Sequence, residues 1–184
     1  MAGGGVCWAV LDFKTERVCF SREVEMPGIT ALLHTCNDEL RIGRALETLR
    51  PCDAIVIVDH GSQDRTLRIA SEYGVVFRKA HEERDNEAAR AARCEWVLCL
   101  RPTESLSEML EASLYEWKLR GEKDVAGVEG VILRVREEHS GTWTESSSEV
   151  RLVRREWKEW VDGFPAGGRG SIELEGDLLR FRSP

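Results

Sequence analysis

The chain has 184 residues, a length typical of a single domain. Its 33 Asp and Glu residues outnumber its 26 Lys and Arg residues, for a net charge of −7, and 42% of its residues are hydrophobic. This composition excludes long disorder and argues against a nucleic-acid partner, because nucleic acid requires a basic surface. No apolar run reaches the ~18 residues of a membrane span, and the amino terminus lacks a signal-peptide pattern. We therefore expect a cytoplasmic protein.

The six cysteines are scattered through apolar segments and form no CxxC pair. They are Cys7, Cys19, Cys36, Cys52, Cys94 and Cys99. In a reducing compartment the simplest interpretation is that they are small buried hydrophobic residues. A zinc site is the weaker alternative, because no pair has the usual spacing of zinc ligands.

Residues 1–28 are predicted to form an extension that precedes the main domain. Cys7–Leu11 and Arg17–Phe20 have the composition of two short strands joined by a polar turn, and Pro27-Gly28 separates them from the rest of the chain. Such a hairpin would cover a sheet edge or dock a protein partner. We assign residues 29–184 to one domain.

Four apolar runs mark the strands of that domain, at residues 29–34, 54–58, 75–77 and 96–100. Uninterrupted apolar runs are typical of strands that are buried on both faces of a parallel sheet. Segments with helical periodicity separate them, at residues 38–50, 63–73 and 83–93. This alternation predicts an α/β fold, with a mostly parallel sheet and helices on both faces.

A further helix is expected after the fourth strand. Leu106, Leu110 and Leu114 share one helical face, and Ser105 with Glu108 forms a candidate capping box at its start. The last third of the chain changes character, because no helical crossover interrupts its strands.

Added antiparallel strands are expected in this last third. Residues 131–135 and 150–153 are predicted strands, separated by a polar stretch through 146–148. Residues 172–181 are predicted to form a short hairpin around Gly176-Asp177, and the glycine-rich segment 163–170 is predicted to be a flexible loop.

Polar residues come directly after three of the predicted strands, in the segments 35–38, 59–62 and 101–104. Ligands of open α/β sheets bind outside the carboxyl ends of the strands, and helix N-termini there favour phosphate groups. Individual residues such as Asn37 and Ser62 are equally ordinary helix caps. Asp59 differs, because it is the first residue after a strand and could accept a hydrogen bond from a base N–H or a ribose hydroxyl.

Several common catalytic motifs are missing from the sequence. No GxGxxG comes after the first strand, and neither GxxxxGK[ST] nor GxSxG occurs, so dinucleotide binding, P-loop hydrolysis and an α/β-hydrolase are not supported. His34 with Cys36 is more simply a buried structural pair than a thiol nucleophile.

The segments Ile29–Glu39 (ITALLHTCNDE) and Ile57–Thr66 (IVDHGSQDRT), with ALETL at 45–49 and IASEYG at 69–74, resemble the family 2 glycosyltransferases. Among these, the sequence is most similar to the bacterial branch related to lipopolysaccharide core glucosyltransferases. The resemblance runs from about Ile29 to Arg155 and is strong in the first half only. It implies a GT-A fold that binds a nucleotide-diphospho-sugar and transfers the sugar with inversion.

The resemblance also implies roles for particular residues. It places Thr35, Asn37 and Glu39 in the nucleotide pocket. Asp59 would hold the base or the ribose. A separate pair, Ser62 and Asp64, would shape the turn after the second strand; all six are thereby candidate nucleotide-binding residues.

The chain departs from the family at its acidic strand-end motif. The usual Leu-Asp-Ala-Asp-Glu stands here as Leu100-Arg-Pro-Thr-Glu104, so that both metal-binding aspartates are replaced. Mg²⁺ and Mn²⁺ prefer carboxylate oxygens, so we expect no metal cofactor and assign Arg101 and Glu104 to the diphosphate. No general base is identifiable, which leaves the catalytic residues unassigned.

The residues support three hypotheses for function. We expect a crevice for a nucleotide sugar, with reduced or lost catalysis. Alternatively, the protein is an active, metal-independent inverting transferase in which Arg101 stabilises the leaving diphosphate. A further alternative is a protein-interaction module on the same scaffold.

Overall fold

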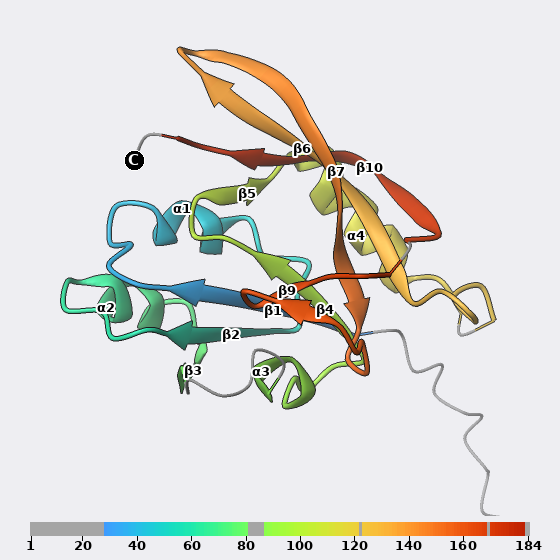
Figure 1. The fold of residues 1–184 in the computed structure, drawn as a ribbon, viewed down its shortest axis with the longest axis horizontal. Helices are drawn as coiled ribbons and strands as arrows, with labels where there is room; N and C mark the ends of the chain where they lie inside the picture. Colours follow the sequence, from blue (N-terminus) through green and yellow to red (C-terminus); the bar gives the residue numbers. More distant parts are fainter. Residues whose placement is uncertain (1–27, 81–86, 122, 169, 183–184) are drawn as a thin grey trace, which may run out of the picture.

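The computed structural model describes residues 28–80, 87–121, 123–168 and 170–182, and Figure 1 shows its fold. The predicted hairpin of residues 1–27 lies outside the described residues. The strands are β1 (Ile29–Thr35), β2 (Ala54–Asp59), β3 (Val76–Lys79), β4 (Trp96–Leu100), β5 (Glu104–Leu106), β6 (Gly130–His139), β7 (Thr142–Arg154), β8 (Trp160–Val161), β9 (Phe164–Pro165) and β10 (Ile172–Arg180). The helices are α1 (Ile42–Glu47), α2 (Thr66–Ser71), α3 (Glu87–Arg90) and α4 (Glu108–Lys118).

One eight-stranded sheet runs through the molecule, in the order β3-β2-β1-β4-β7-β6-β10-β5. β1 lies between β2 and β4 and is parallel to both, and β3 is parallel to β2. The four strands therefore end at the same edge, as the α/β prediction requires. All four residues of β3 are exposed, so the expectation that this run is buried on both faces was wrong. The reason is its place at the edge of the sheet.

The second half of the sheet is mixed. β7 is antiparallel to both β4 and β6, which confirms the added antiparallel strands, whereas β10 is parallel to β6. The predicted polar break at 146–148 lies inside β7, and β9 falls within the predicted loop 163–170.

The predicted hairpin at 172–181 was also wrong, because β10 is one strand with an irregularity between Glu173 and Asp177. Gly176 has a φ of +96° there, and a Cβ on it would overlap the backbone of Leu110. The glycine thus lets β10 pass close to α4, instead of reversing the chain.

The helices are shorter than the periodicity predicted. α1 and α2 each have six residues, because the segments before them form loops. α4 begins later than expected: Ser107, not Ser105, is its N-cap, and its Oγ accepts a hydrogen bond from Leu110 N at 3.3 Å. Ser105 and Leu106 instead belong to β5, which pairs with β10. Among the described residues, no helix has the length and apolar character to cross a membrane.

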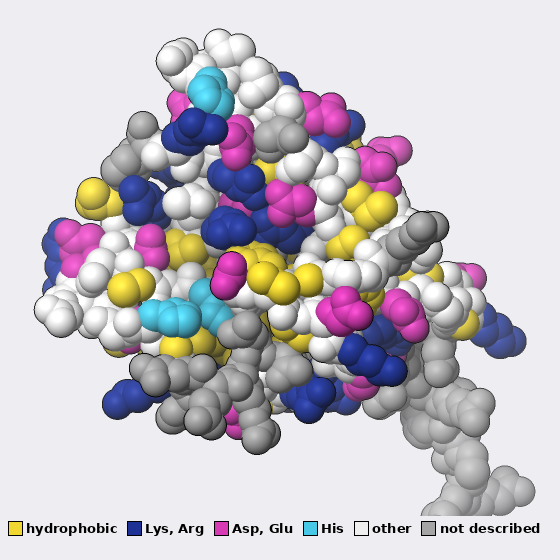
Figure 2. All heavy atoms as spheres, viewed as in Figure 1, with side chains coloured by type: hydrophobic (Ala, Val, Ile, Leu, Met, Phe, Trp, Pro, Cys, Tyr) yellow, Lys and Arg dark blue, Asp and Glu magenta, His cyan; other side chains and the backbone are white. Residues whose placement is uncertain are grey.

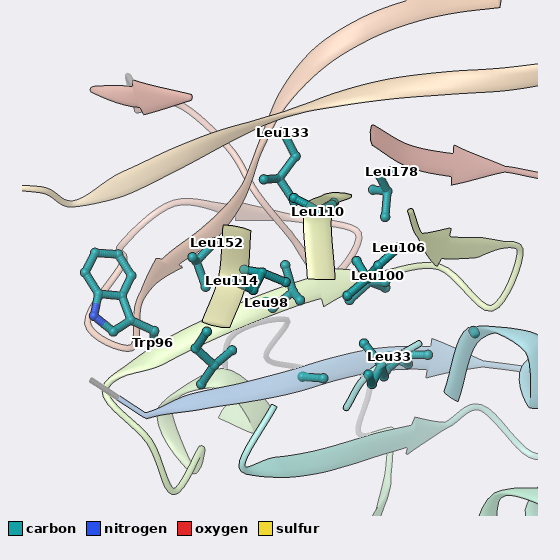
Figure 3. Packing of buried hydrophobic residues seen from close by; sticks show 14 of the residues in the cluster. Leu33, Trp96, Leu98, Leu100, Leu106, Leu110, Leu114, Leu133, Leu152 and Leu178 are labelled. Carbon is teal, nitrogen blue, oxygen red and sulfur yellow. The ribbon is translucent and has the colours of Figure 1, made fainter. Parts of the chain in front are cut away.

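Alternate residues of the central strands feed two hydrophobic clusters on opposite faces of the sheet. Ala31 and Leu33 face α1, α2 and α4, whereas Leu32 faces α3. The predicted placement of helices on both faces is therefore confirmed. Figure 3 shows the larger cluster, in which Leu98 and Leu100 of β4 lie beside Leu110 and Leu114 of α4. Each such buried side chain contributes about 1.5–3 kcal/mol, so this cluster is what holds the strand ends in place.

Candidate functional site

The carboxyl edge of the parallel strands is the candidate site. Asp59 ends β2 and is the register partner of Thr35 at the end of β1. On the other side of β1, Leu100 ends β4 opposite Leu33, and Arg101 is the next residue. Asp59 and Arg101 therefore lie on the same edge of the sheet, with β1 between their strands (Figure 1).

Asp59 organises the turn after β2. Its Oδ2 accepts from Gly61 N at 3.1 Å, and its two carboxylate oxygens accept from Ser62 N at 3.1 and 3.2 Å. Partial burial acts to raise the pKa of Asp59, but the hydrogen bonds from Ser62 and Gly61, with the nearby charge of His60, hold it below the ordinary value. Asp59 is thus a carboxylate that keeps lone pairs for a further donor.

The loop after β1 is tied to the loop after β2. Asn37 adopts a positive φ of 56°, which asparagine tolerates better than most residues. Its backbone N donates to Ser62 Oγ at 3.0 Å, and its Oδ1 accepts from Gln63 N at 2.8 Å. These reciprocal bonds fix the shape of the two loops relative to each other.

Two further carboxylates strengthen the same connection. Glu39 Oε2 accepts from the backbone N and the Nε of Arg65, at 3.0 and 3.1 Å, and the hydrogen bonds from Arg65 lower the pKa of Glu39. Asp64 accepts from Glu39 N at 3.1 Å and from Thr66 N at 2.9 Å. Thr35 Oγ1 donates to a carboxylate of the same loop, that of Asp38, at 2.8 Å.

The structure therefore brings together the six residues that the sequence assigned to nucleotide binding. They are Thr35, Asn37, Glu39, Asp59, Ser62 and Asp64. Most of their polar side-chain atoms bond to one another or to neighbouring backbone. They give the two loops a fixed shape, and the Asp59 carboxylate stands at the strand end between them.

Glu104 lies at the other side of the site and is fully buried. Its carboxylate accepts from Arg151 Nη2 at 3.1 Å and from Arg180 Nη2 at 2.8 Å, and it also accepts from the backbone N of Arg101 at 2.8 Å. Glu149 bonds to the same two arginines, so that charges from β5, β7 and β10 form one network. Both Glu104 oxygens are occupied by cationic partners.

Sequence reasoning missed Arg151 and Arg180. Each is an isolated charge inside an apolar strand, in V-R-L-V and L-L-R-F, and such a charge must find a partner when the strand is buried. That signal was present in the sequence. The identity of the partner was not, because it lies on a distant strand.

Arg101 differs from its neighbours in the network. Its side chain is 49% exposed, whereas that of Arg151 is 1% exposed. The Arg101 guanidinium carbon lies 4.4 Å from the centre of the Phe164 ring, and its Nε is 3.9 Å from Glu104. Within the described parts of the chain, no acceptor bonds to its terminal nitrogens. Arg101 is therefore the arginine of this cluster with donors to spare.

These residues do not fit a divalent metal ion. Arg101, Pro102 and Thr103 offer no carboxylate, and the one carboxylate of the segment, Glu104, is bonded to two guanidinium groups. Residues 28–80, 87–121, 123–168 and 170–182 contain no group of three or more His, Cys, Asp or Glu side chains arranged to hold a metal. Hard cations need several free oxygen ligands, so no step here is assigned to a metal.

A cavity of about 560 Å³ lies next to this edge, on the α3 face of the sheet. His34 Nδ1 and His60 Nε2 line it and are 3.0 Å apart, within hydrogen-bonding distance. The sequence placed these histidines in separate motifs and gave no sign that they meet. The other polar residues that line the cavity are Arg78, Lys79, Glu87 and Asp162.

The space-filling view shows the same region from outside. Lys and Arg side chains gather in the middle of the face shown in Figure 2, directly above a band of hydrophobic side chains, and His side chains lie below and to the left. The β8–β9 hairpin crosses this part of the molecule (Figure 1), and its Trp160 and Phe164 pack against the cluster that contains Val97 and Cys99.

Comparison with known proteins identifies the class of fold. No family model and no curated protein matches the chain. A crystal structure of a mycobacterial protein matches with a TM-score of 0.55 and 15% identity, over 86% of this chain and 68% of that one. Glucosyl-3-phosphoglycerate synthase from Mycobacterium tuberculosis, solved with Mn²⁺, UDP and phosphoglyceric acid, matches with a TM-score of 0.50 and 17% identity, over 71% of this chain and 57% of that one.

TarS from S. aureus is also similar, at 20% identity and a TM-score of 0.48, but the match spans 61% of this chain and only 22% of TarS. The matches thus span part of the length of each of these proteins. At such identities the likeness establishes the fold alone. The fold is that of the GT-A glycosyltransferases, a mixed α/β sheet whose parallel strands deliver their loops to one edge.

Proposed function

We propose that this chain is a family 2-type glycosyltransferase scaffold that binds a nucleotide-diphospho-sugar without a divalent cation and with reduced or lost transfer activity. The observation that carries the proposal is the replacement of the acidic strand end by Arg101, beside a Glu104 that is already bonded to two arginines. In this proposal the Arg101 guanidinium takes the place where the resemblance leads one to expect a metal ion.

The nucleoside half of the ligand belongs beside Asp59 in this proposal. The carboxylate is ionised at neutral pH, because its pKa is lowered, and it can accept from a base N–H or from a ribose hydroxyl. In this proposal the loop that holds Thr35, Asn37 and Glu39 borders the nucleoside, and the hydrogen bonds of Asn37 and Glu39 to the facing loop fix its shape. Ser62 and Asp64 hold the turn in shape, through bonds to Asn37 N and Glu39 N.

The diphosphate half belongs beside Arg101. A planar guanidinium binds phosphate oxygens through parallel N–H donors, and the terminal nitrogens of Arg101 have no acceptor among the described residues. Glu104 acts on the ligand indirectly, since it accepts from Arg101 N and thereby fixes the start of the loop.

Catalysis is expected to be weak or absent because no general base is identified among the described residues of this edge. General-base assistance contributes about 10²–10⁴-fold to a rate, and its loss leaves binding intact. The site can therefore bind the nucleotide sugar even if it does not transfer the sugar.

The test is calorimetric titration of the full chain with UDP, GDP and dTDP, and with their sugar conjugates, in buffer that contains EDTA. We expect at least one nucleotide to bind, and Asp59→Asn and Arg101→Gln each to weaken that binding about tenfold or more. Glu116→Gln on α4 and Arg93→Gln at the opposite end of β4 are matched controls, because both side chains belong to exposed residues away from this edge.

Two results would contradict the proposal. Absence of binding by every nucleotide would leave the protein-interaction hypothesis. Sugar transfer or donor hydrolysis at an ordinary enzyme rate, unaffected by EDTA, would show instead an active metal-independent transferase.

A further inference from the structure

The β8–β9 hairpin brings an aromatic ring to the exposed arginine of the site. Phe164 begins β9, and its ring centre lies 4.4 Å from the guanidinium carbon of Arg101 and 4.6 Å from that of Arg151. Both distances are in the range of cation–π contacts. Phe164 belongs to none of the motifs that carry the family resemblance.

The two arginines differ in what else they bond. Arg151 donates to Glu104, to Glu149 and to the carbonyl of Cys99, so its planar group is already fixed in place. Among the described residues, the guanidinium of Arg101 makes two contacts, the 3.9 Å approach to Glu104 and the cation–π contact with the Phe164 ring. Its orientation therefore depends on the ring.

The hairpin is itself held firmly at both ends. At its base, Trp160 Nε1 donates to Trp157 O at 2.8 Å, and Trp157 Nε1 donates to Ala166 O at 3.1 Å. At its turn, Gly163 has a φ of +76° and lies so close to His34 that a Cβ would overlap the imidazole. The ring of Phe164 is thus carried on a fixed support.

A stacked guanidinium keeps its hydrogen-bond donors available. The ring covers a flat face, whereas the N–H groups point outward in the plane, towards the directions from which phosphate oxygens are bound. An unstacked arginine on a solvent-exposed loop must lose side-chain rotamer freedom before it can bind, and this loss weakens affinity.

We propose that Phe164 is a positioning residue for Arg101, which it holds ready for the diphosphate of a nucleoside-diphosphate ligand. The ring makes no bond to the ligand and acts through the guanidinium. This inference rests on the proposed function for the identity of the ligand, but the positioning itself is a property of the free protein.

The free protein is tested first, by NMR of the arginine Nε–Hε groups. In the wild type, the Arg101 signal is expected to show restricted motion on the ps–ns timescale, and its side-chain protons to show a ring-current shift. Phe164→Leu should release both, while Phe164→Tyr, which keeps the ring, should preserve them. An Arg101 that is equally mobile in the wild type and in Phe164→Leu overturns the inference, whether or not any ligand binds.

Binding is tested with inorganic pyrophosphate and with the nucleotide that binds best, in EDTA. We expect Phe164→Leu to weaken both about fivefold, Phe164→Tyr to restore the wild-type affinity, and Phe164→Leu to have no further effect in an Arg101→Gln background. Phe181→Leu is the matched control, since Phe181 also stacks on an arginine, with 4.1 Å between its ring centre and the guanidinium carbon of Arg44.

The outcomes separate the two proposals. If the wild type binds and Phe164→Leu binds equally well or more tightly, the positioning role is wrong, and tighter binding would show that the ring blocks the site. If Arg101 is equally mobile with and without the ring and no nucleotide binds the wild type, the proposed function and the positioning role both fail. If the motion of Arg101 is restricted only when the ring is present, and no nucleotide binds, the positioning role is supported. In that case only the proposed ligand is overturned. Thermal unfolding of each variant confirms that it is folded.

Discussion

Arg151 and Glu104 form a buried ion pair, with side chains that are 1% and 0% exposed and two contacts of 3.1 and 3.3 Å between them. A pair of this kind is costly to bury, since both charges leave water, and it persists because every remaining donor of Arg151 finds an acceptor. The two residues join β5 to β7, which are not neighbours in the sheet.

Glu104→Gln is expected to destabilise the fold by up to about 3–5 kcal/mol, because it removes one of the two carboxylates that neutralise the buried charge of Arg151 and leaves Glu149 as the other. The double variant Glu104→Gln/Arg151→Met should recover part of this loss, since it removes both charges. Urea unfolding provides the measurement. Arg182→Gln is the control, because that side chain is 61% exposed and its ion pair should contribute less than about 1 kcal/mol. A loss for Glu104→Gln as small as that of the control would show that the pair is not buried in solution.

Acid should weaken the same network through Glu149. Burial acts to raise the pKa of Glu149, but the Arg151 charge and hydrogen bonds from Ser147, Arg151 and Arg180 outweigh it and lower the pKa from 4.5 to about 2. A depressed folded-state pKa gives stability that is present above the unfolded value of 4.5 and is lost as the pH falls towards 2. The urea midpoint of the wild type should therefore fall over this range, and less steeply for Glu149→Gln. If the urea midpoint falls equally steeply with pH in the wild type and in Glu149→Gln, the pKa of Glu149 is not lowered. Glu116→Gln is the control, and it should behave as the wild type does.

Two glycines with nearly the same backbone angle should respond differently to alanine. Gly163 has a φ of +76° and faces His34, whereas Gly141 has a φ of +77° and faces open space. Gly141→Ala should cost about 1 kcal/mol, from backbone strain alone. Gly163→Ala adds a steric clash, worth roughly 1–3 kcal/mol more. The difference between the two variants in the free energy of unfolding, measured with urea, gives the cost of the clash. Equal losses of stability would mean that the hairpin turn does not pack on His34.

Two serines near the start of α4 provide a similar comparison. Ser107 Oγ accepts from Leu110 N and from Asp177 N, at 3.3 and 2.9 Å, so Ser107→Ala should cost about 1–2 kcal/mol. Ser105 Oγ is buried and has no hydrogen-bond partner among the described residues. Ser105→Ala should therefore be neutral or slightly stabilising. Thermal unfolding distinguishes them, and the reverse order would restore Ser105 as the cap.

Two substitutions at the strand end should create the acidic metal-binding pattern of the family that the sequence resembles. Arg101→Asp with Thr103→Asp removes a cation and adds two carboxylates of the kind that Mn²⁺ prefers. We expect UDP binding to become at least tenfold tighter in Mn²⁺ than in EDTA, with no such difference in the wild type. Calorimetry measures this, and Arg93→Asp controls for the change of charge. Without a response to Mn²⁺, residues 100–104 do not correspond to the acidic motif of the family.

Three strands of the parallel half, β1, β2 and β4, were predictable because they are largely buried. β1, β2 and β4 appear in the sequence as unbroken apolar runs, and Asp59 stands out because it comes at the end of one of them. The short helices were not predictable in length. Asp38 and Asp64 suit a first helical turn, but they lie in the loops before α1 and α2. The backbone N of Asp38 donates to Thr66 Oγ1 at the start of α2, and the Asp64 carboxylate accepts from Glu39 N in the facing loop.

The arginine network could not be predicted from the sequence, for a different reason. Glu104 meets Arg151 47 residues later and Arg180 76 residues later, and no local pattern indicates which charges will meet. For β10 the sequence predicted a turn that the structure does not contain, because a glycine before an aspartate is a common turn signal. In the structure, Gly176-Asp177 lies within β10, where α4 approaches the strand too closely for a Cβ.

The position of β10 between β6 and β5 also sets an order of assembly on the ribosome. β5 has β10 as its partner in the sheet, and β10 is synthesised more than 60 residues later. Until that last strand arrives, the nascent chain holds Glu104 without the guanidinium of Arg180 and β5 without its ladder. The Glu104 side of the site can therefore form only after β10 has been synthesised, because Arg180 supplies one of its ion pairs.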